Sequence, residues 1–287
     1  MNGCTRVLRS AMVVLALAIS TAEIAGQGAT RFNPPKRYYL ALGDSLAFGF
    51  QFVRFNANVP TVPAAIFSTG YVDDLSGRLR EIRADITTLN YGCPGETTVT
   101  FIHGGCLYTA SGFPLHDSYD GAQLPAALAF LRAHRGQVSP ITINLGTNDL
   151  NGLSTLCGDD VSCYFANGPA VLDRIATNLN DILGQLRAAA PEAEIITFTN
   201  YDVASLADQR LAQLNQAFNA AVISTAAASS VRVADVFGAF NGGPQPVTLC
   251  ALTFVCTPLQ DSHPTDAGYE VIAQQIWAES DYDRLRP

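Results

Sequence analysis

Short apolar runs alternate with longer amphipathic stretches along the chain. Five runs of five or six residues, rich in β-branched or aromatic side chains, are typical of buried strands. They cover residues 37–42, 85–89, 141–146, 194–199 and 231–236. Between them, apolar residues recur every three or four positions, which predicts helices. The predicted helices cover residues 71–82, 124–133, 171–186, 206–227 and 265–277.

Strands that alternate with helices and are apolar along most of their length indicate a parallel sheet covered on both faces. The pattern therefore predicts an α/β fold, a three-layer sandwich with a central, mostly parallel five-stranded sheet. Two stretches follow neither period and are rich in glycine, serine and aromatic residues. We expect residues 97–121 and 151–169 to be ordered loops, because both contain cysteine.

The N-terminal residues have the pattern of an export signal. Arg6 and Arg9 precede an apolar run over residues 11–19, and small residues follow it. A run of this length is too short to span a bilayer comfortably, which favours a cleaved signal peptide over an anchor. The pattern predicts cleavage between Ala22 and Thr30.

This interpretation divides the chain into three parts. We expect a signal peptide over residues 1–26, a flexible leader over residues 27–36 and a single domain over residues 37–287. The mature protein is then secreted, with no stable membrane insertion after cleavage.

The cysteines agree with export. Of the seven, Cys4 lies in the predicted signal, and an even number remains. Even numbers of cysteines in exported chains are typical of disulfides, and the spacing here favours bridges between neighbours. The predicted pairs are Cys93–Cys106, Cys157–Cys163 and Cys250–Cys256.

Composition excludes several kinds of partner. The net charge is −8, and no cluster of Lys or Arg lies beyond the N-terminus, which argues against a nucleic-acid partner. A metal site is disfavoured, because the chain has no C-x-x-C pair and only four histidines. No organic cofactor is implied either.

Polar, glycine-bearing segments follow the first three predicted strands. They contain Ser45 in the stretch GDSL, then Asn90 to Gly95, then Asn148 in the stretch GTND. An Asp-Ser-His sequence, with Asp261 and His263, follows near the C-terminus. Because parallel strands present their carboxyl ends at one edge, we expect a serine, an amide and an imidazole to meet there.

These four segments resemble the four sequence blocks of the SGNH/GDSL serine hydrolases, and the blocks span residues 37–278. The resemblance implies a flavodoxin-like SGNH hydrolase fold, with Ser45 as nucleophile, His263 as base and Asp261 as orienting acid. It also implies an oxyanion hole made by the backbone N–H groups of Ser45 and Gly95 and the side-chain amide of Asn148. Among family members, secreted bacterial lipases and esterases are the most similar in their disulfides.

Two alternatives stay open within this site. Gly92 competes with Gly95 as the oxyanion donor, because either glycine lets backbone approach a ligand. The family places the acid three residues before the histidine, where this chain has Gln260. Asp261 then orients His263 through a shifted turn, or a backbone carbonyl does so and the site is a dyad.

Neighbouring residues have less specific interpretations. Asp44 and Asp149 are expected to brace loops, and His103, His116 and His134 to lie in loops or at the surface. Four phenylalanines follow the serine closely and could line an acyl pocket or simply pack in the core; they are Phe48, Phe50, Phe52 and Phe55.

The leading functional hypothesis is a secreted lipase or esterase that cleaves small-molecule or lipid carboxylic esters through an acyl-enzyme. A carbohydrate deacetylase acting on acetylated xylan or pectin is the second hypothesis, since the resembled family includes both kinds. A non-catalytic binding module is the third, and the intact Ser45, Asn148 and His263 argue against it. An α/β-hydrolase is disfavoured, because the second glycine of the nucleophile elbow is missing after Ser45.

Overall fold

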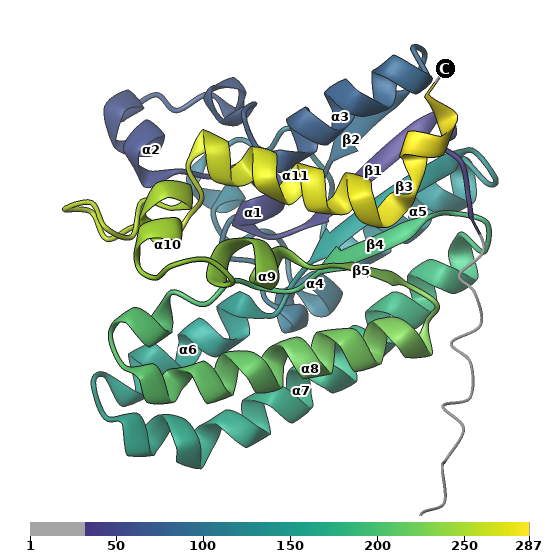
Figure 1. The fold of residues 1–287 in the computed structure, drawn as a ribbon. Coiled ribbons are helices and arrows are strands. Elements are labelled where there is room, and N and C mark those ends of the chain that lie inside the picture. Colours follow the sequence, from purple (N-terminus) through teal and green to yellow (C-terminus); the bar gives the residue numbers. More distant parts are fainter. Residues whose placement is uncertain (1–31, 287) are drawn as a thin grey trace, which may run out of the picture. The chain divides into compact units, whose positions relative to one another are not determined.

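A five-stranded sheet forms the centre of the computed structural model, which describes residues 32–286 (Figure 1). The strands are paired in the order β2-β1-β3-β4-β5, and every neighbouring pair is parallel. The predicted α/β fold with five strands is therefore confirmed. The strands are β1 (Tyr38–Gly43), β2 (Thr87–Asn90), β3 (Val138–Asn144), β4 (Ile195–Phe198) and β5 (Arg232–Ala234).

One face of the sheet is covered by α3 (Tyr71–Ile82) and α11 (Asp266–Ser280). Successive side chains of a strand point to opposite faces, so Tyr39 and Ala41 of β1 both reach this layer. Both residues are fully buried there against apolar side chains of the two helices, such as Leu75. The helical period of the apolar residues in 71–82 thus corresponds to the face of α3 that is buried against the sheet.

The opposite face is covered by α5 (Gln123–Ala133), α7 (Val161–Ala189) and α8 (Ala212–Ala228). Leu40 and Leu42 of β1 are fully buried against this layer. Figure 1 shows α7 and α8 side by side on the side of the sheet away from α3 and α11. Burial on both faces explains why the strands are continuous apolar runs.

Shorter helices occupy the connections that leave the carboxyl ends of the strands. Five 3₁₀ helices complete the described chain: Ala64–Phe67, Thr109–Ser111, Ala204–Leu206, Gln209–Leu211 and Tyr282–Leu285. The short α-helices are α1 (Ser45–Phe48), α2 (Phe52–Asn58), α4 (Thr98–His103), α6 (Thr147–Cys157), α9 (Val236–Asn241) and α10 (Val247–Leu252). Most of these short helices lie in the connections that start at the carboxyl ends of the strands, which is the edge where the sequence predicts a site.

The prediction of a loop over residues 151–169 was wrong. This stretch contains most of α6 and the first turns of α7, which extends ten residues further toward the N-terminus than its apolar period indicates. Asp160 caps α7 by accepting hydrogen bonds from the backbone N–H groups of Ser162 and Cys163. Pro169 lies inside the helix, and the polar and small residues before it conceal the period.

Other helix and strand boundaries differ from the predicted ones for local reasons. Residues 97–121 contain α4 and a 3₁₀ turn within an otherwise irregular loop. Strand β3 begins at Val138, before the Ser139-Pro140 step and three residues earlier than predicted. The register of β1 against β3 shifts at this step, which accommodates a proline in a central strand. The helix predicted over 206–227 begins at Ala212, because 3₁₀ turns precede it.

The predicted signal peptide lies outside the described residues. The end of the predicted leader contacts the domain, because the backbone N–H of Lys36 donates to the carbonyl of Ser139 and that of Asn33 donates to Glu194. Within residues 32–286, no helix combines the length and the apolar character that crossing a membrane requires.

A close backbone approach at the end of β1 leads to a testable prediction. Gly43 has φ +129°, and a Cβ there would lie 2.3 Å from the carbonyl oxygen of Asn144. We expect Gly43→Ala to lower the free energy of unfolding by about 2–4 kcal/mol, through strain and displacement of β3.

Gly77 in α3 provides the matched control, because a Cβ there meets nothing within 4 Å. Gly77→Ala should raise the free energy of unfolding by up to about 1 kcal/mol, since alanine favours helix. Urea unfolding of both variants measures the two effects, and equal effects would contradict the assignment of strain to Gly43.

Candidate active site

Ser45 lies at the point where β1 ends and α1 begins. The Asp44 side chain caps this short helix by accepting the backbone N–H of Leu46 at 2.9 Å. Ser45 is 9% exposed, so its hydroxyl sits at the surface of a largely buried turn. The strand end thus presents the serine in the way its sequence indicates.

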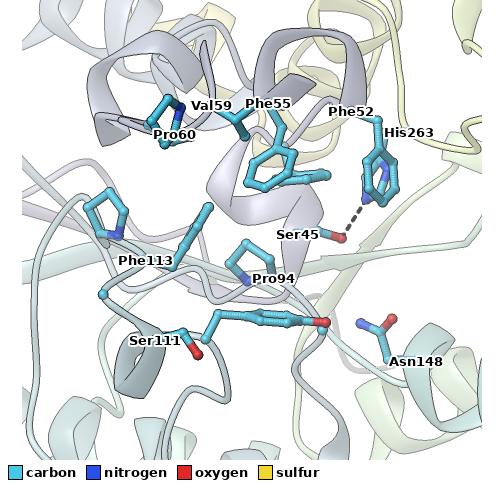
Figure 2. A pocket seen from close by; sticks show the side chains of 16 residues that line it. Ser45, Phe52, Phe55, Val59, Pro60, Pro94, Ser111, Phe113, Asn148 and His263 are labelled. Carbon is cyan, nitrogen blue, oxygen red and sulfur yellow. Dashed lines mark hydrogen bonds between the residues drawn. The ribbon is translucent and has the colours of Figure 1, made fainter. Parts of the chain in front are cut away.

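His263 and Asp261 complete a continuous chain of hydrogen bonds from this serine. The His263 Nε2 atom lies 3.0 Å from Ser45 Oγ (Figure 2). On the other side of the ring, His263 Nδ1 lies 2.5 Å from Asp261 Oδ1. Asp261 is 4% exposed and also accepts the backbone N–H of Phe52. Burial alone would raise the pKa of Asp261, but its hydrogen bond to His263 and the charge of the imidazole hold that pKa below its ordinary value.

A tight turn brings Asp261 to the histidine. The backbone N–H of Gln260 donates to the carbonyl of Thr257, and Gln260 has φ +47° in the left-handed region. This left-handed residue ends the turn immediately before Asp261. As a result, Gln260 is exposed to solvent and Asp261 faces the imidazole. The geometry favours the shifted-turn alternative over a dyad.

The backbone N–H groups of Ser45 and Gly95 are both available to a ligand. Neither donates to an acceptor within residues 32–286, and both residues line the same cavity. Gly95 adopts φ +79°, and the ring of Tyr108 lies against it. The N–H of Gly92 instead donates to Asn90 Oδ1, and a Cβ on Gly92 would lie 2.4 Å from the backbone of Phe48. The structure therefore favours Gly95 over Gly92 as a donor.

Asn148 stands on the first turn of α6, beside the serine turn. Its Nδ2 donates to the carbonyl of Glu96 at 2.9 Å and lies 3.4 Å from Asp44 Oδ2. Asp44 therefore fixes both the serine turn and the asparagine side chain. Asp149, the next residue, accepts the backbone N–H and the hydroxyl of Thr98 at 2.8 Å each, which ties α6 to α4. Both aspartates brace loops.

A cavity of about 530 Å³ opens next to these groups (Figure 2). Ser45, His263 and Asn148 lie at one end, and the remaining wall is mostly apolar. Phe50 and Phe52 pack edge-on against the His263 ring, with centroids 5.1 and 5.9 Å away. The other lining residues include Phe55, Val59, Pro60, Val62, Pro94, Tyr108, Phe113 and Pro114.

The four phenylalanines after the serine divide between the two predicted roles. Phe48 is fully buried and packs on Phe67, whereas Phe50, Phe52 and Phe55 line the cavity. A wall of this kind accommodates an apolar chain attached to a polar reacting group.

Buried polar groups support the strand end from behind. Gln123 is fully buried; its Oε1 accepts the Gly43 N–H at 2.7 Å, and its Nε2 donates to the Gly43 carbonyl and to Glu96. Burial raises the pKa of Asp44 to about 7 and that of Glu96 to about 7. Each of these carboxyls therefore holds a proton more tightly than an exposed one does.

Sequence reasoning missed Gln123 and Tyr108. Gln123 is 80 positions from the glycine that it binds, so no spacing could connect them. Tyr108 lies two residues after Cys106. The predicted Cys93–Cys106 disulfide was the one signal in the sequence that this loop returns to the segment from Asn90 to Gly95. Of the three other histidines, His116 braces the site through a 2.9 Å contact between its Nε2 and the Phe48 carbonyl. The cavity lining includes none of the three.

All three disulfides join the predicted neighbours, namely Cys93–Cys106, Cys157–Cys163 and Cys250–Cys256. The first bridge ties the segment of Gly95 to that of Tyr108. The last closes a loop shortly before Asp261 and His263. Closing loops this short contributes roughly 2–3 kcal/mol each in the chain-entropy model.

Together these groups can perform acyl transfer. A hydroxyl next to an imidazole can attack a carbonyl, and N–H donors can bind the resulting oxyanion. In the described part of the chain, no three His, Cys, Asp or Glu side chains are grouped as metal ligands.

The buried Glu96 predicts a pH dependence of stability. A carboxyl whose pKa is raised from 4.5 to about 7 by folding stabilises the protein fully below about pH 4.5 and loses that contribution as pH rises through about 7. We expect Glu96→Gln to remove roughly 1–3 kcal/mol of the decline in free energy of unfolding across this range.

Denaturant unfolding at several pH values measures this slope. The control is Glu192→Gln, because the Glu192 side chain is 60% exposed and should leave the slope unchanged. An identical slope in wild type and Glu96→Gln would contradict the prediction.

Comparisons with known proteins agree with this geometry. A model of the GDSL-like lipase/acylhydrolase family matches residues 41–271. No curated protein sequence matches the chain significantly.

Two solved structures illustrate the likeness in fold. An acetylxylan esterase from Geobacillus stearothermophilus superposes with a TM-score of 0.58 at 17% identity, covering 88% of this chain and 97% of that one. An extracellular lipase from Streptomyces rimosus superposes with a TM-score of 0.54 at 17% identity, covering 84% of this chain and 99% of its own. Since the family match spans most of the chain, the protein belongs to the GDSL-like lipase/acylhydrolase family, a family of carboxylic ester hydrolases.

Proposed function

We propose that the protein hydrolyses carboxylic esters of apolar acyl chains through an acyl-enzyme on Ser45. The observation that carries this proposal is the continuous Asp261–His263–Ser45 chain, with contacts of 2.5 and 3.0 Å, at the end of an apolar cavity. These three hydrogen-bonded side chains supply a nucleophile, a base and an orienting acid, and the cavity accommodates the acyl group.

The acylation step begins with attack of Ser45 Oγ on the ester carbonyl carbon while His263 Nε2 takes the hydroxyl proton. Negative charge then collects on the former carbonyl oxygen. The N–H groups of Ser45 and Gly95 bind this oxygen, as does the amide of Asn148, which gives up its 3.4 Å contact with Asp44. One such donor typically contributes about 10²–10³ in rate. The alcohol leaves with the proton from His263.

Water completes the reaction by the same route. His263 takes a proton from the water as its oxygen attacks the acyl carbon, and the proton then returns to Ser45 Oγ as the acid is released. Asp261 stays ionised throughout, because its hydrogen bonds to the imidazole and to Phe52 favour the charged form. Its role is to hold the imidazole with Nδ1 protonated and Nε2 facing the serine.

The size of the cavity bears on the substrate. An acetyl group would fill only a small part of about 530 Å³ lined by Phe50, Phe55 and Phe113, whereas a longer acyl chain would bury its methylenes there. Deacetylation of a carbohydrate is the second candidate, supported by the fold shared with an acetylxylan esterase.

We also propose that the protein is exported. Three disulfides favour an oxidising compartment, and the apolar run over residues 11–19 behind Arg6 and Arg9 has the form of a signal peptide.

The role of Asp261 is tested with Asp261→Asn. Loss of the carboxylate favours the wrong imidazole tautomer, so we expect kcat on a soluble ester to fall by about 10²–10⁴. Gln260→Asn is the matched control, because Gln260 is exposed on the same turn and should retain turnover within about twofold of wild type. Near-normal turnover in Asp261→Asn would reject the triad.

Substrate class is tested with dissolved p-nitrophenyl esters of increasing chain length. Each buried methylene contributes about 0.8 kcal/mol, so kcat/KM should rise up to about fourfold per methylene from acetate until the cavity is full. The same preparation is assayed for acetate release from acetylated xylan. A maximum at acetate, together with faster release from xylan, would favour the deacetylase instead.

A further inference from the structure

Three segments beside the cavity carry almost no charge. Residues 97–116 and 236–260 contain no Asp, Glu, Lys or Arg, and residues 45–72 contain only Arg54. Charged residues make up 15% of the whole chain, so segments of this length would each carry several at the average frequency. We call the solvent-facing surface of these three segments the uncharged rim.

The single charge of the rim is neutralised in place. Arg54 on α2 forms an ion pair with Asp266 at the start of α11, with Nη2 and Oδ2 2.7 Å apart. Its Nε also donates to Gln51 Oε1. The guanidinium is therefore directed toward the body of the protein and adds no free cation to the rim.

Two of the three segments line the cavity, and the third contacts the turn that carries His263. Residues 45–72 and 97–116 provide most of its lining, with Phe55 and Phe113 among them. The third segment leads directly to the catalytic turn, where Phe254 N–H donates to the His263 carbonyl and Asp261 accepts the N–H of Phe52. Figure 1 shows α2 and α10, from the first and third segments, at the same end of the molecule.

The uncharged rim exposes an unusual share of apolar side chains. Eight of the thirteen large hydrophobic residues exposed within residues 32–286 belong to it. No side chain of helix α2 is fully buried, although four of its seven residues are apolar. The eight residues are Phe52, Val53, Val59, Val99, Leu107, Tyr108, Val247 and Leu259. Exposed apolar surface concentrated at a site marks contact with another apolar body.

We propose that the uncharged rim docks on a lipid surface without net charge and admits acyl esters from it directly into the cavity. This inference rests on the proposed ester hydrolysis at Ser45. The protein has a net charge of −8, so an anionic surface would repel it, whereas a zwitterionic surface would not. Contact with acyl chains removes surface groups from water, and this costs the most free energy when the groups are charged. An uncharged rim avoids that cost.

Docking of the rim on lipid shortens the path of an ester from the lipid surface to Ser45. Residues 45–72 and 97–116 provide most of the cavity lining, so an acyl chain that leaves lipid at the rim passes directly onto apolar side chains. The contact is peripheral, because side chains of loops and short helices provide it.

The experiment is flotation of the protein with vesicles of dioleoylphosphatidylcholine, carried out in the Ser45→Ala background so that lipid is not consumed. Val53 and Leu107 are 42% and 59% exposed and do not line the cavity. The double variant Val53→Ser/Leu107→Ser should lower vesicle partitioning by roughly tenfold or more. In the presence of Ser45, the same double variant should retain activity on dissolved p-nitrophenyl esters within about twofold.

The matched control is Ile223→Ser on α8, since Ile223 is 50% exposed and lies outside the rim. It should leave partitioning unchanged. Equal partitioning of the double variant and the control, stronger binding to phosphatidylglycerol than to phosphatidylcholine, or no binding at all would overturn the inference. A dimer that the double variant dissociates in sedimentation velocity, without vesicle binding, would assign the rim to a second copy and also overturn it.

The same measurements separate this inference from the proposed function. Rim-dependent vesicle binding without hydrolysis of dissolved esters would support docking and reject the proposed reaction. Hydrolysis of dissolved esters without vesicle binding would support the proposed reaction and reject docking.

Discussion

The parallel pairing of β1 with β3 is the interaction on which the rest of the site depends. Gly43 lies opposite Asn144 at the carboxyl end of the pair, and the absence of a Cβ on Gly43 allows the two backbones to approach closely. Both strands leave the sheet at the same point, so Ser45 and Asn148 stand beside one another a few residues later. Strand β2 pairs on the other side of β1 and delivers the segment of Gly95 to the same edge.

The third partner of the serine arrives from a distant part of the sequence and needs its own anchorage. An isolated bridge between Thr253 and Pro264 fixes the chain on either side of the turn of residues 261–263, and the Cys250–Cys256 disulfide closes the loop before it. Gln51 adds a further tie by donating to the carbonyl of Pro264. The turn of residues 261–263 is thus held by contacts separate from the one between His263 and Ser45.

Behind Ser45, buried polar groups fix the end of β1 at a cost in stability. Asp44 and Glu96 are buried carboxyls, and burial opposes their ionisation. An apolar pair would pack there at lower cost, yet it could not bind the N–H of Leu46 or the amide of Gln123. The strand end is therefore stiffened by polar groups whose protonation depends on pH.

Much of the sheet could be predicted, because burial on both faces leaves apolar runs that sequence alone reveals. The convergence of Ser45, Asn148 and His263 could also be anticipated, since parallel strands end at one edge. The helix over residues 161–170 could not, because Pro169 and a polar first turn conceal its period while Asp160 caps it. The contact of Gln123 with Gly43 and the left-handed turn at Gln260 depend on three-dimensional proximity and backbone handedness, which spacing does not encode.

The closeness of Asp261 to His263 in the sequence has a mechanical consequence. The two residues share one turn, and Asp261 Oδ1 accepts both the ring Nδ1–H and the backbone N–H of His263. The carboxylate and the imidazole are therefore held to each other within one turn, and their mutual geometry does not depend on a contact between distant segments. The contact between His263 Nε2 and Ser45 Oγ, by contrast, joins residues 218 positions apart, so it depends on how this turn is anchored against the end of β1.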